Sequence, residues 1–221
     1  MICADQGALT DQTKIINASS VEWLHIDVMD GQFVPRLGMY PEQVKSIRQI
    51  TDKKIDAHMM VVNPEPYIRV FADSGLSLMS VHVENNIHIN RTLGLIKQAG
   101  MESGVILNTS TSESSIQYLL DDNNLKLVML LGINPGIIGQ GIWKPIYQKI
   151  RNLRTYLNSH GRHDVVIQVD GSVKKENSSE LIRAGTDILV CGTSTIFRPQ
   201  EGSLAQTIKK YRTKVNKELG A

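Results

Sequence analysis

The chain has 221 residues, of which 41% are hydrophobic and 21% are charged, a composition typical of one soluble globular domain. Its 24 Lys and Arg residues nearly balance 22 Asp and Glu residues, so it lacks the basic excess of a nucleic-acid-binding protein. The longest apolar runs are far shorter than the roughly 20 residues that cross a bilayer, and no signal-peptide pattern opens the chain. These features predict a cytoplasmic protein in which residues 1–221 form one domain and neither nucleic acid nor membrane is a partner.

Short apolar segments rich in Val, Ile, Leu and Met alternate with segments of helical spacing. The predicted strands are residues 22–27, 54–60, 78–83, 103–107, 127–132, 165–169 and 187–191, with residues 1–4 as the tail of an eighth. The segment 144–157 carries an apolar stripe at i, i+4, i+7 and i+11, which predicts an amphipathic helix. Ser110 and Glu113 have the spacing of a capping box, and Gly75, Gly100 and Gly185 predict helix ends.

Buried strands that alternate with amphipathic helices predict a parallel sheet covered by helices. A (β/α)8 TIM barrel usually needs about 250 residues, with a practical minimum of about 200, so this chain fits a compact barrel. We therefore predict an α/β fold, a (β/α)8 barrel with a shortened first strand. A doubly wound open sheet is the alternative.

Titratable side chains gather at the C-terminal ends of the predicted strands, where the active sites of such folds lie. His25 and Asp27 share one face of a strand, His58 ends the next, and Asp170 ends a later one. Two imidazoles and two carboxylates suit zinc, manganese, iron or cobalt, although strand histidines also occur as hydrogen-bonded core residues. His82 and Glu84 end another strand and fit a supporting role as well as a structural one.

Glycine-containing turns follow three successive late strands. They begin at Asn134, Gly171 and Gly192, and each leads towards a helix. Backbone N–H groups at such turns bind anions, and TIM barrels commonly hold phosphate after their last two strands. The sequence therefore predicts a phosphate-binding site.

Two strings of residues resemble a known family. The string from His25 to Pro35, HIDVMDGQFVP, is similar to the signature of ribulose-phosphate 3-epimerases, and Asp56 to Val61, DAHMMV, resembles their second signature. The three glycine turns follow in the family's order and spacing. The resemblance extends from Ile2 to about Phe197.

The resemblance implies a ribulose-phosphate-binding barrel, an isomerase of the pentose phosphate branch of carbohydrate metabolism. Such an enzyme inverts carbon 3 of D-ribulose 5-phosphate, through an enediolate, to give D-xylulose 5-phosphate. By the same resemblance, one divalent metal ion (Zn, Mn, Fe or Co) is held by His25, Asp27, His58 and Asp170, and Asp27 and Asp170 are the acid/base pair. The implied substrate contacts are His58, Met29, Met60, Gly136, Ile137, Ile138, Gly139, Gly171, Ser172, Gly192 and Thr193. Homo-oligomeric assembly is also implied.

This chain departs from the family pattern at several positions. Ile137 and Ile138 replace an aromatic and a small residue, Leu131 replaces a methionine, and Arg36 replaces an asparagine. Met1 falls where the first strand of family members is ending, so a shortened first strand is expected.

Two other functions compete with ribulose-phosphate epimerisation. Ser172 stands where ribulose-phosphate enzymes usually have a second glycine. Together with Gly192-Thr193-Ser194 it resembles the pattern of allulose-6-phosphate 3-epimerases, which makes D-allulose 6-phosphate the alternative substrate. A catalytically silent phosphosugar-binding barrel is the second alternative. Related barrels that decarboxylate or cleave sugar phosphates are disfavoured, since they carry a lysine near the reacting carbon and only Lys54, at a strand start, is available here.

Overall fold

The computed structural model describes residues 1–137 and 139–220. Within these residues, seven parallel strands form one curled sheet in which each strand pairs with the one before it. The strands are β1 (Trp23–Met29), β2 (Lys54–Met60), β3 (Leu78–His82), β4 (Glu102–Leu107), β5 (Leu125–Leu131), β6 (Val166–Asp170) and β7 (Ile188–Leu189). A doubly wound sheet reverses its strand order at a switch point, and this sheet does not, so the barrel prediction is confirmed and the doubly wound alternative is wrong.

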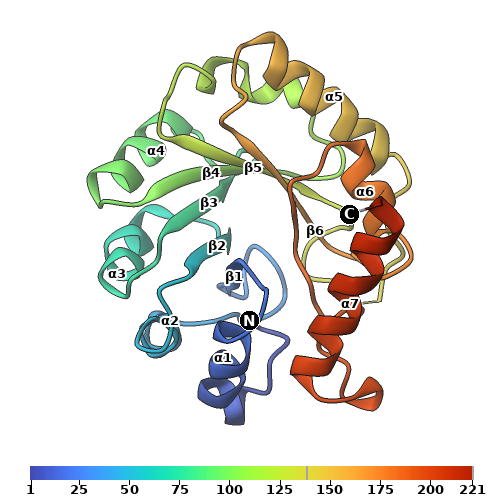
Figure 1. Ribbon diagram of the computed structural model, residues 1–221. Helices are drawn as coiled ribbons and strands as arrows, with labels where there is room; N and C mark the ends of the chain where they lie inside the picture. Colours follow the sequence, from blue (N-terminus) through green and yellow to red (C-terminus); the bar gives the residue numbers. More distant parts are fainter. Residues whose placement is uncertain (138, 221) are drawn as a thin grey trace.

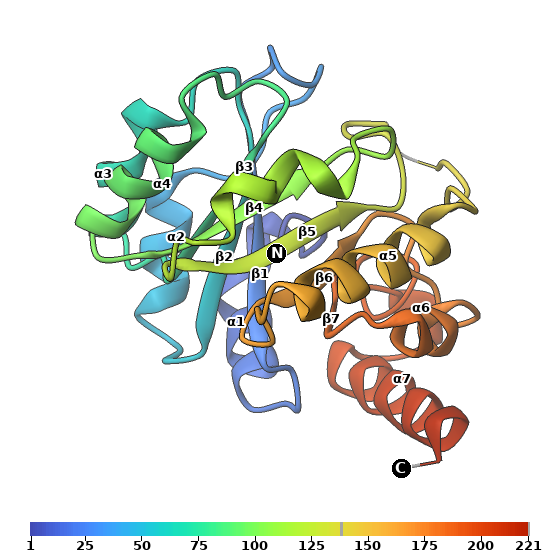
Figure 2. The ribbon, with the colours of Figure 1, turned by 90° about the horizontal axis from the view of Figure 1, so that it is seen from above.

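The helices cover the outside of the curled sheet, as Figures 1 and 2 show. The α-helices are α1 (Leu9–Asn17), α2 (Pro41–Arg48), α3 (Ile68–Asp73), α4 (Ile89–Gln98), α5 (Ile146–Ser159), α6 (Ser178–Ala184) and α7 (Leu204–Leu219). Short 3-10 helices are η1 (Gln6–Ala8), η2 (Glu65–Tyr67), η3 (Glu113–Leu119) and η4 (Pro199–Glu201). The apolar stripe predicted in 144–157 is buried in α5. Among the residues described, no helix combines the length and apolar character needed to span a membrane.

The start of the chain differs from the prediction, because residues 1–4 form a turn and not a strand. The Ala4 N–H donates to the Met1 carbonyl at 2.9 Å, and η1 begins directly after Asp5, whose carboxylate caps it. The ammonium of Met1 donates to the His25 carbonyl on the edge of β1. The described residues contain no ladder between β1 and the two-residue β7, so the sheet is open there.

The predicted capping box at Ser110 is also wrong. The helix there is the 3-10 helix η3, and its cap is Ser112, which accepts a hydrogen bond from the Ser114 N–H at 3.3 Å. The preceding residues form a turn in which the Thr111 N–H donates to the Asn108 carbonyl at 3.1 Å. Because of this turn, the helix begins only after Ser112.

Alternate residues of the strands fill the inside of the curled sheet. Leu78, Ile106, Leu127, Met129 and Leu131 form the internal apolar cluster, and a larger cluster lies between the strands and the helices. Gly104 belongs to the inner face, and a Cβ on it would lie 2.2 Å from the Ser80 hydroxyl. The inside of the barrel is therefore apolar, and its polar mouth lies at the C-terminal ends of the strands.

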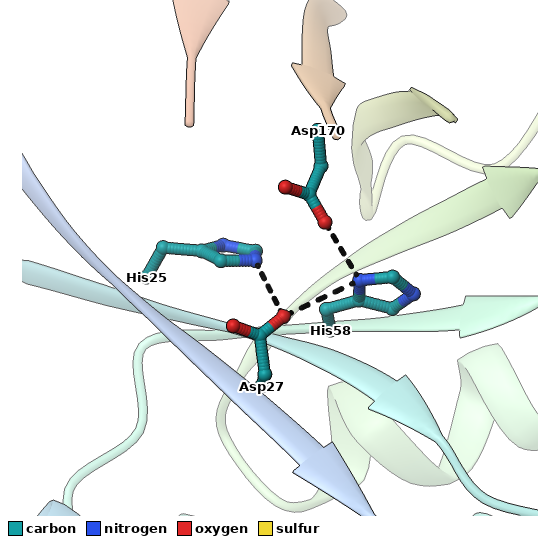
Figure 3. Close-up of side chains that lie close together, drawn as sticks. All are labelled: His25, Asp27, His58 and Asp170. Carbon is teal, nitrogen blue, oxygen red and sulfur yellow. Dashed lines mark hydrogen bonds and ion pairs between the residues drawn. The ribbon is translucent and has the colours of Figure 1, made fainter. Parts of the chain in front are cut away.

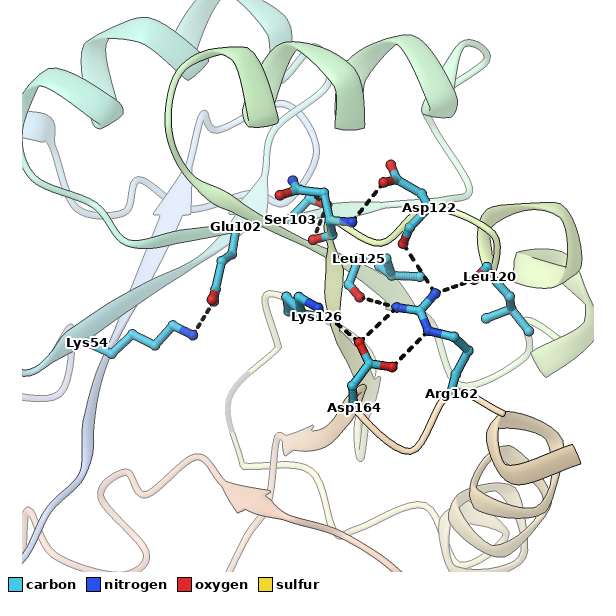
Figure 4. Close-up of polar contacts among 10 residues, drawn as sticks. Lys54, Glu102, Ser103, Leu120, Asp122, Leu125, Lys126, Arg162 and Asp164 are labelled. Carbon is cyan, nitrogen blue, oxygen red and sulfur yellow. Dashed lines mark hydrogen bonds and ion pairs between the residues drawn. The ribbon is translucent and has the colours of Figure 1, made fainter. Parts of the chain in front are cut away.

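Charged residues tie the loops together at the opposite end, where the strands begin (Figure 4). The buried Arg162 guanidinium donates to the carbonyls of Leu120 and Leu125, the latter at 2.7 Å. Its Nε lies 2.9 Å from the Asp164 carboxylate, which also accepts from Lys126 at 2.9 Å. This end of the barrel is thus held by hydrogen bonds that play no part in the mouth.

Candidate active site

Four titratable side chains meet at the mouth of the barrel (Figure 3). His25 and Asp27 both point inward from β1 because side chains alternate along a strand. His58 on β2 lies directly opposite Asp27 in the register of the two strands. Asp170, the last residue of β6, reaches the group from the other side of the barrel. The structure therefore brings together all four predicted metal ligands.

The distances within this group are short enough for a shared ion. The His58 Nδ1 atom lies 3.7 Å from Asp27 Oδ1 and 3.3 Å from Asp170 Oδ2, and His25 Nε2 lies 3.5 Å from Asp27 Oδ1. The four ligand atoms all lie within 4.8 Å of one another. Across residues 1–137 and 139–220, His25 Nε2 is buried and has no hydrogen-bond partner. An unpartnered imidazole nitrogen beside two carboxylates fits a divalent metal ion, so the group can hold one.

The electrostatics of this group follow from its burial and its mixed charges. Burial would raise the pKa of Asp27, but the adjacent imidazoles of His25 and His58 outweigh this effect and hold the pKa below its usual range. Burial would likewise lower the pKa of His25, yet the Asp56 and Asp27 carboxylates raise it well above its usual value. Each group thus stabilises the charged form of its neighbour.

Asp56 contacts the ring nitrogen of His25 that points away from the cluster. It lies opposite His25 in the β1–β2 register, and its Oδ2 atom is 2.7 Å from His25 Nδ1. Gln168 donates to the same oxygen at 3.0 Å, and Asp56 is fully buried. No role was predicted for Asp56, although its position two residues before His58 places both side chains on one face of β2. With Nδ1 bound to Asp56, His25 presents Nε2 to the cluster.

His82 and Glu84 lie behind His58. The Nε2 atoms of His58 and His82 are 2.9 Å apart, and His82 Nδ1 is 3.1 Å from Glu84 Oε2. Burial lowers the pKa of His82 to about 4. Burial opposes ionisation of Glu84, but hydrogen bonds from His82 and Thr111 outweigh it and lower its pKa to about 2. His82 is therefore in contact with the cluster, and Glu84 is joined to it through His82.

A cavity of about 600 Å³ opens beside the cluster. Its lining includes predicted site residues from β1, β6 and the two last glycine turns, namely His25, Asp27, Asp170, Gly171, Ser172, Gly192 and Thr193. The cavity continues between β1 and β7 towards α7, where Tyr211 and Val215 line it. Gly136, Ile137 and Gly139 are not among its lining residues.

Met29 and Met60 are buried next to the cluster. They are partners in the β1–β2 register and pack with Val34 in a small apolar group. Soft thioether side chains at this place surround the mouth of the barrel without offering a base.

The glycine turn after β5 packs against neighbouring loops. Gly136 has a φ of +76°, and a Cβ on it would lie 2.6 Å from Val34. Ser172, with a φ of 54°, donates from its hydroxyl to the Gln140 carbonyl at 3.0 Å and so joins this turn to the loop after β6. The predicted contact Ile138 lies outside the described residues.

Several known proteins with similar sequences are named as ribulose-phosphate 3-epimerases. Residues 1–197 match the model of the ribulose-phosphate 3 epimerase family. The ribulose-phosphate 3-epimerase of Bacillus subtilis (strain 168) is 38% identical over 194 residues, which cover 88% of this chain and 88% of that protein. The chloroplastic ribulose-5-phosphate-3-epimerase of Arabidopsis thaliana is 37% identical over 211 residues, which cover 95% of this chain and 73% of the plant protein.

Solved structures with a similar fold are more distant in sequence. A crystal structure of KGPDC from Streptococcus mutans superposes with a TM-score of 0.76 at 12% identity and covers 98% of this chain and 95% of its own. A 3-hexulose-6-phosphate synthase superposes with a TM-score of 0.69 at 14% identity and covers 94% of this chain and 93% of its own. These likenesses concern the barrel fold alone. On the family match and the identities to the epimerases, the chain belongs to the ribulose-phosphate 3-epimerase family.

Proposed function

We propose that the protein is a metal-dependent isomerase that inverts carbon 3 of D-ribulose 5-phosphate to give D-xylulose 5-phosphate. The observation that carries this proposal is the placement of Asp27 and Asp170, which approach His58 Nδ1 from β1 and β6 at 3.7 and 3.3 Å. Inversion needs one group to remove a proton from one face of the sugar and another to return a proton to the opposite face. Two carboxylates from opposite sides of one cavity meet that need.

Asp27 and Asp170 exchange roles with the direction of the reaction. One carboxylate accepts the carbon 3 proton, which leaves an enediolate, and the other donates a proton to the opposite face of the same carbon. A divalent ion held by His25, Asp27, His58 and Asp170 supplies positive charge that stabilises the enediolate when it is bound. Met29 and Met60 exclude water beside the reacting carbon without competing for its proton.

The late glycine turns are proposed to bind the phosphate of the sugar. The cavity that Asp170 lines is also lined by residues of the last two glycine turns, namely Gly171, Ser172, Gly192 and Thr193. A phosphosugar that spans this cavity would place its phosphate on the backbone N–H groups of these turns. Gly136, Ile137, Ile138 and Gly139 are proposed to complete this site from the turn after β5, which Ser172 joins to the cavity.

Deuterium exchange followed by NMR tests the proposal. The purified protein with Mn²⁺ or Zn²⁺ is offered D-ribulose 5-phosphate and D-allulose 6-phosphate in separate samples in heavy water. We expect deuterium at carbon 3 of the pentulose and the appearance of D-xylulose 5-phosphate. Exchange confined to the hexulose would reassign the substrate, and no exchange in either sample with metal bound would indicate a silent phosphosugar-binding barrel.

Three further properties belong to the same proposal. The resident ion is Zn, Mn, Fe or Co, which metal analysis of protein purified without added metal distinguishes. The protein is a homo-oligomer, for which light scattering after gel filtration gives the mass. It acts in the cytoplasm, where cell fractionation would place it.

A further inference from the structure

We propose that Glu84, acting through His82, determines which nitrogen of His58 carries the proton and so leaves the His58 Nδ1 lone pair facing Asp27 and Asp170. Glu84 is then a positioning residue for the metal site, although it lies outside the ligand group. The inference rests on the proposed metal site and is independent of which sugar is the substrate.

The side chains of His58, His82 and Glu84 form a row, and one contact joins each neighbouring pair. His58 Nδ1 faces the two aspartates, and its Nε2 atom lies 2.9 Å from His82 Nε2. His82 Nδ1 in turn lies 3.1 Å from Glu84 Oε2. The His82 side chain is inaccessible to solvent, and the Phe33 ring packs against it at a centroid distance of 4.6 Å. The His58–His82 contact is therefore closed to water, which otherwise could reverse its hydrogen bond.

The direction of each hydrogen bond follows from Glu84. A carboxylate can only accept, so His82 carries its proton on Nδ1 and donates it to Glu84. A buried neutral imidazole then has a lone pair on Nε2, which accepts a hydrogen bond from His58 Nε2. His58 is left with no proton on Nδ1. The reverse direction would set a His82 lone pair against the Glu84 carboxylate at 3.1 Å. The chosen direction sets the His58 Nδ1 lone pair 3.3 Å from Asp170 Oδ2, and a cation bound between these two atoms removes that repulsion.

The second oxygen of Glu84 is fixed independently of His82. Glu84 Oε1 accepts from the Asn108 backbone N–H at 2.7 Å and from the Thr111 hydroxyl. A backbone N–H can only donate, so the atom at the Oε1 position must be an acceptor. A glutamine at position 84 would therefore keep its carbonyl oxygen towards Asn108 and turn its NH₂ group towards His82.

This constraint makes Glu84→Gln the decisive variant. Its NH₂ group would donate to His82 Nδ1, move the His82 proton to Nε2, and force His58 to accept there and to carry its own proton on Nδ1. We expect the affinity of the apo-protein for Zn²⁺, measured by competition with a chelator, to fall by about 10- to 100-fold. Glu84→Ala removes the acceptor that keeps the His82 proton on Nδ1 but adds no donor that would move it to Nε2. The fall in zinc affinity should therefore be smaller than in Glu84→Gln.

The order of the two variants separates positioning from packing. If Glu84 only filled space, the isosteric Glu84→Gln would lower zinc affinity less than Glu84→Ala. Glu65→Gln is the control, because the Glu65 side chain is 25% exposed against 24% for Glu84 and also binds a threonine. Zinc affinity in this control should equal that of the unaltered protein. Thermal unfolding of each apo-variant shows that it is folded.

A measurement on the unaltered protein keeps the inference testable if a variant fails to fold. In the metal-free protein, ¹⁵N NMR of the His58 ring should show the proton on Nε2 and none on Nδ1. A proton on Nδ1, or a glutamine variant that binds zinc as well as the alanine variant or better, would overturn the inference. If the unaltered protein binds no zinc or manganese at all, the proposed metal site itself fails.

Discussion

Asp27 and Asp170 are separated by most of the chain, yet both approach one imidazole nitrogen. Each carboxylate is expected to serve one face of the sugar only. The two residues should therefore fail in different ways when one of them is removed, because the remaining carboxylate can still exchange a proton on its own face.

For Asp170→Asn, we expect epimer formation to fall by at least about 10²-fold. Deuterium should still enter carbon 3 of one epimer, because Asp27 remains available on its side. ¹H NMR in heavy water, started separately from each of the two sugars, measures both quantities. Asp73→Asn, in an exposed pair with Arg69, is the control. Undiminished interconversion of the two sugars by the Asp170 variant would contradict the assignment.

The sequence was sufficient to group the four ligand residues, because period-two alternation and the ends of parallel strands place His25, Asp27 and His58 on one edge. Glu84 was a candidate for a supporting role, but the sequence was insufficient to identify its contacts, and it predicted no role for Asp56. Asp56 acts through the β1–β2 register, and Glu84 contacts Asn108 of a loop 24 residues away. Neither relation is encoded in local spacing.

At the scale of elements, the loops at the lower end of the barrel depend on one guanidinium. Arg162 donates to the Leu120 and Leu125 carbonyls, and its own side chain is buried. A side chain of similar size without donors would leave these carbonyls unpaired in a region from which water is excluded.

We expect Arg162→Met to lower the free energy of unfolding by about 2–3 kcal/mol, since buried acceptors lose their partners. Urea denaturation measures the change. Arg151→Met is the control, because Arg151 is exposed and bonds only to Gln148 among the described residues. A loss in Arg162→Met no larger than in this control would show that the carbonyls find other donors.

Asp164, the ion-pair partner of Arg162, should make the stability of this region depend on pH. Arg162 and Lys126 hold the pKa of Asp164 below its usual range, so its contribution to stability is present above the usual carboxyl pKa and is lost as pH falls. Asp164 is about half exposed, which limits that contribution to about 1 kcal/mol. The difference in urea midpoint between the unaltered protein and Asp164→Asn should be positive at pH 7 and shrink by pH 3. A difference that grows on acidification would contradict the sign.

Elements with many apolar residues were predictable and short polar ones were not. The seven strands follow from runs such as Leu127–Leu131, which only a buried position explains. The segment 1–4 was misassigned because its apolar residues resemble a strand, whereas Asp5 starts η1 immediately. The helix cap was misplaced from Ser112 to Ser110 because the Asn108–Thr111 turn depends on Glu84, which is remote in sequence.

At the scale of the whole molecule, metal binding should raise the stability of the fold, because the four ligands come from three strands that the unfolded chain does not hold together. At a free metal concentration of 100 times Kd, the expected gain is about 2.7 kcal/mol.

Thermal unfolding with increasing Mn²⁺ measures this gain as a rise in Tm, and a chelator should reverse it. His25→Ala removes one ligand and should abolish most of the rise. A rise of equal size in that variant would place the stabilising ion elsewhere on the protein.

Each strand of the described sheet after β1 pairs with the strand that was synthesised just before it. No pairing in the described sheet has to wait for a distant part of the chain, so the loop closed at each step is a single strand–helix unit. During translation, each new unit can therefore add to an edge that already exists, in the order in which it leaves the ribosome. The four-residue ligand group is the exception, because Asp170 arrives only with the sixth strand, so the sheet can grow well before the candidate site is complete.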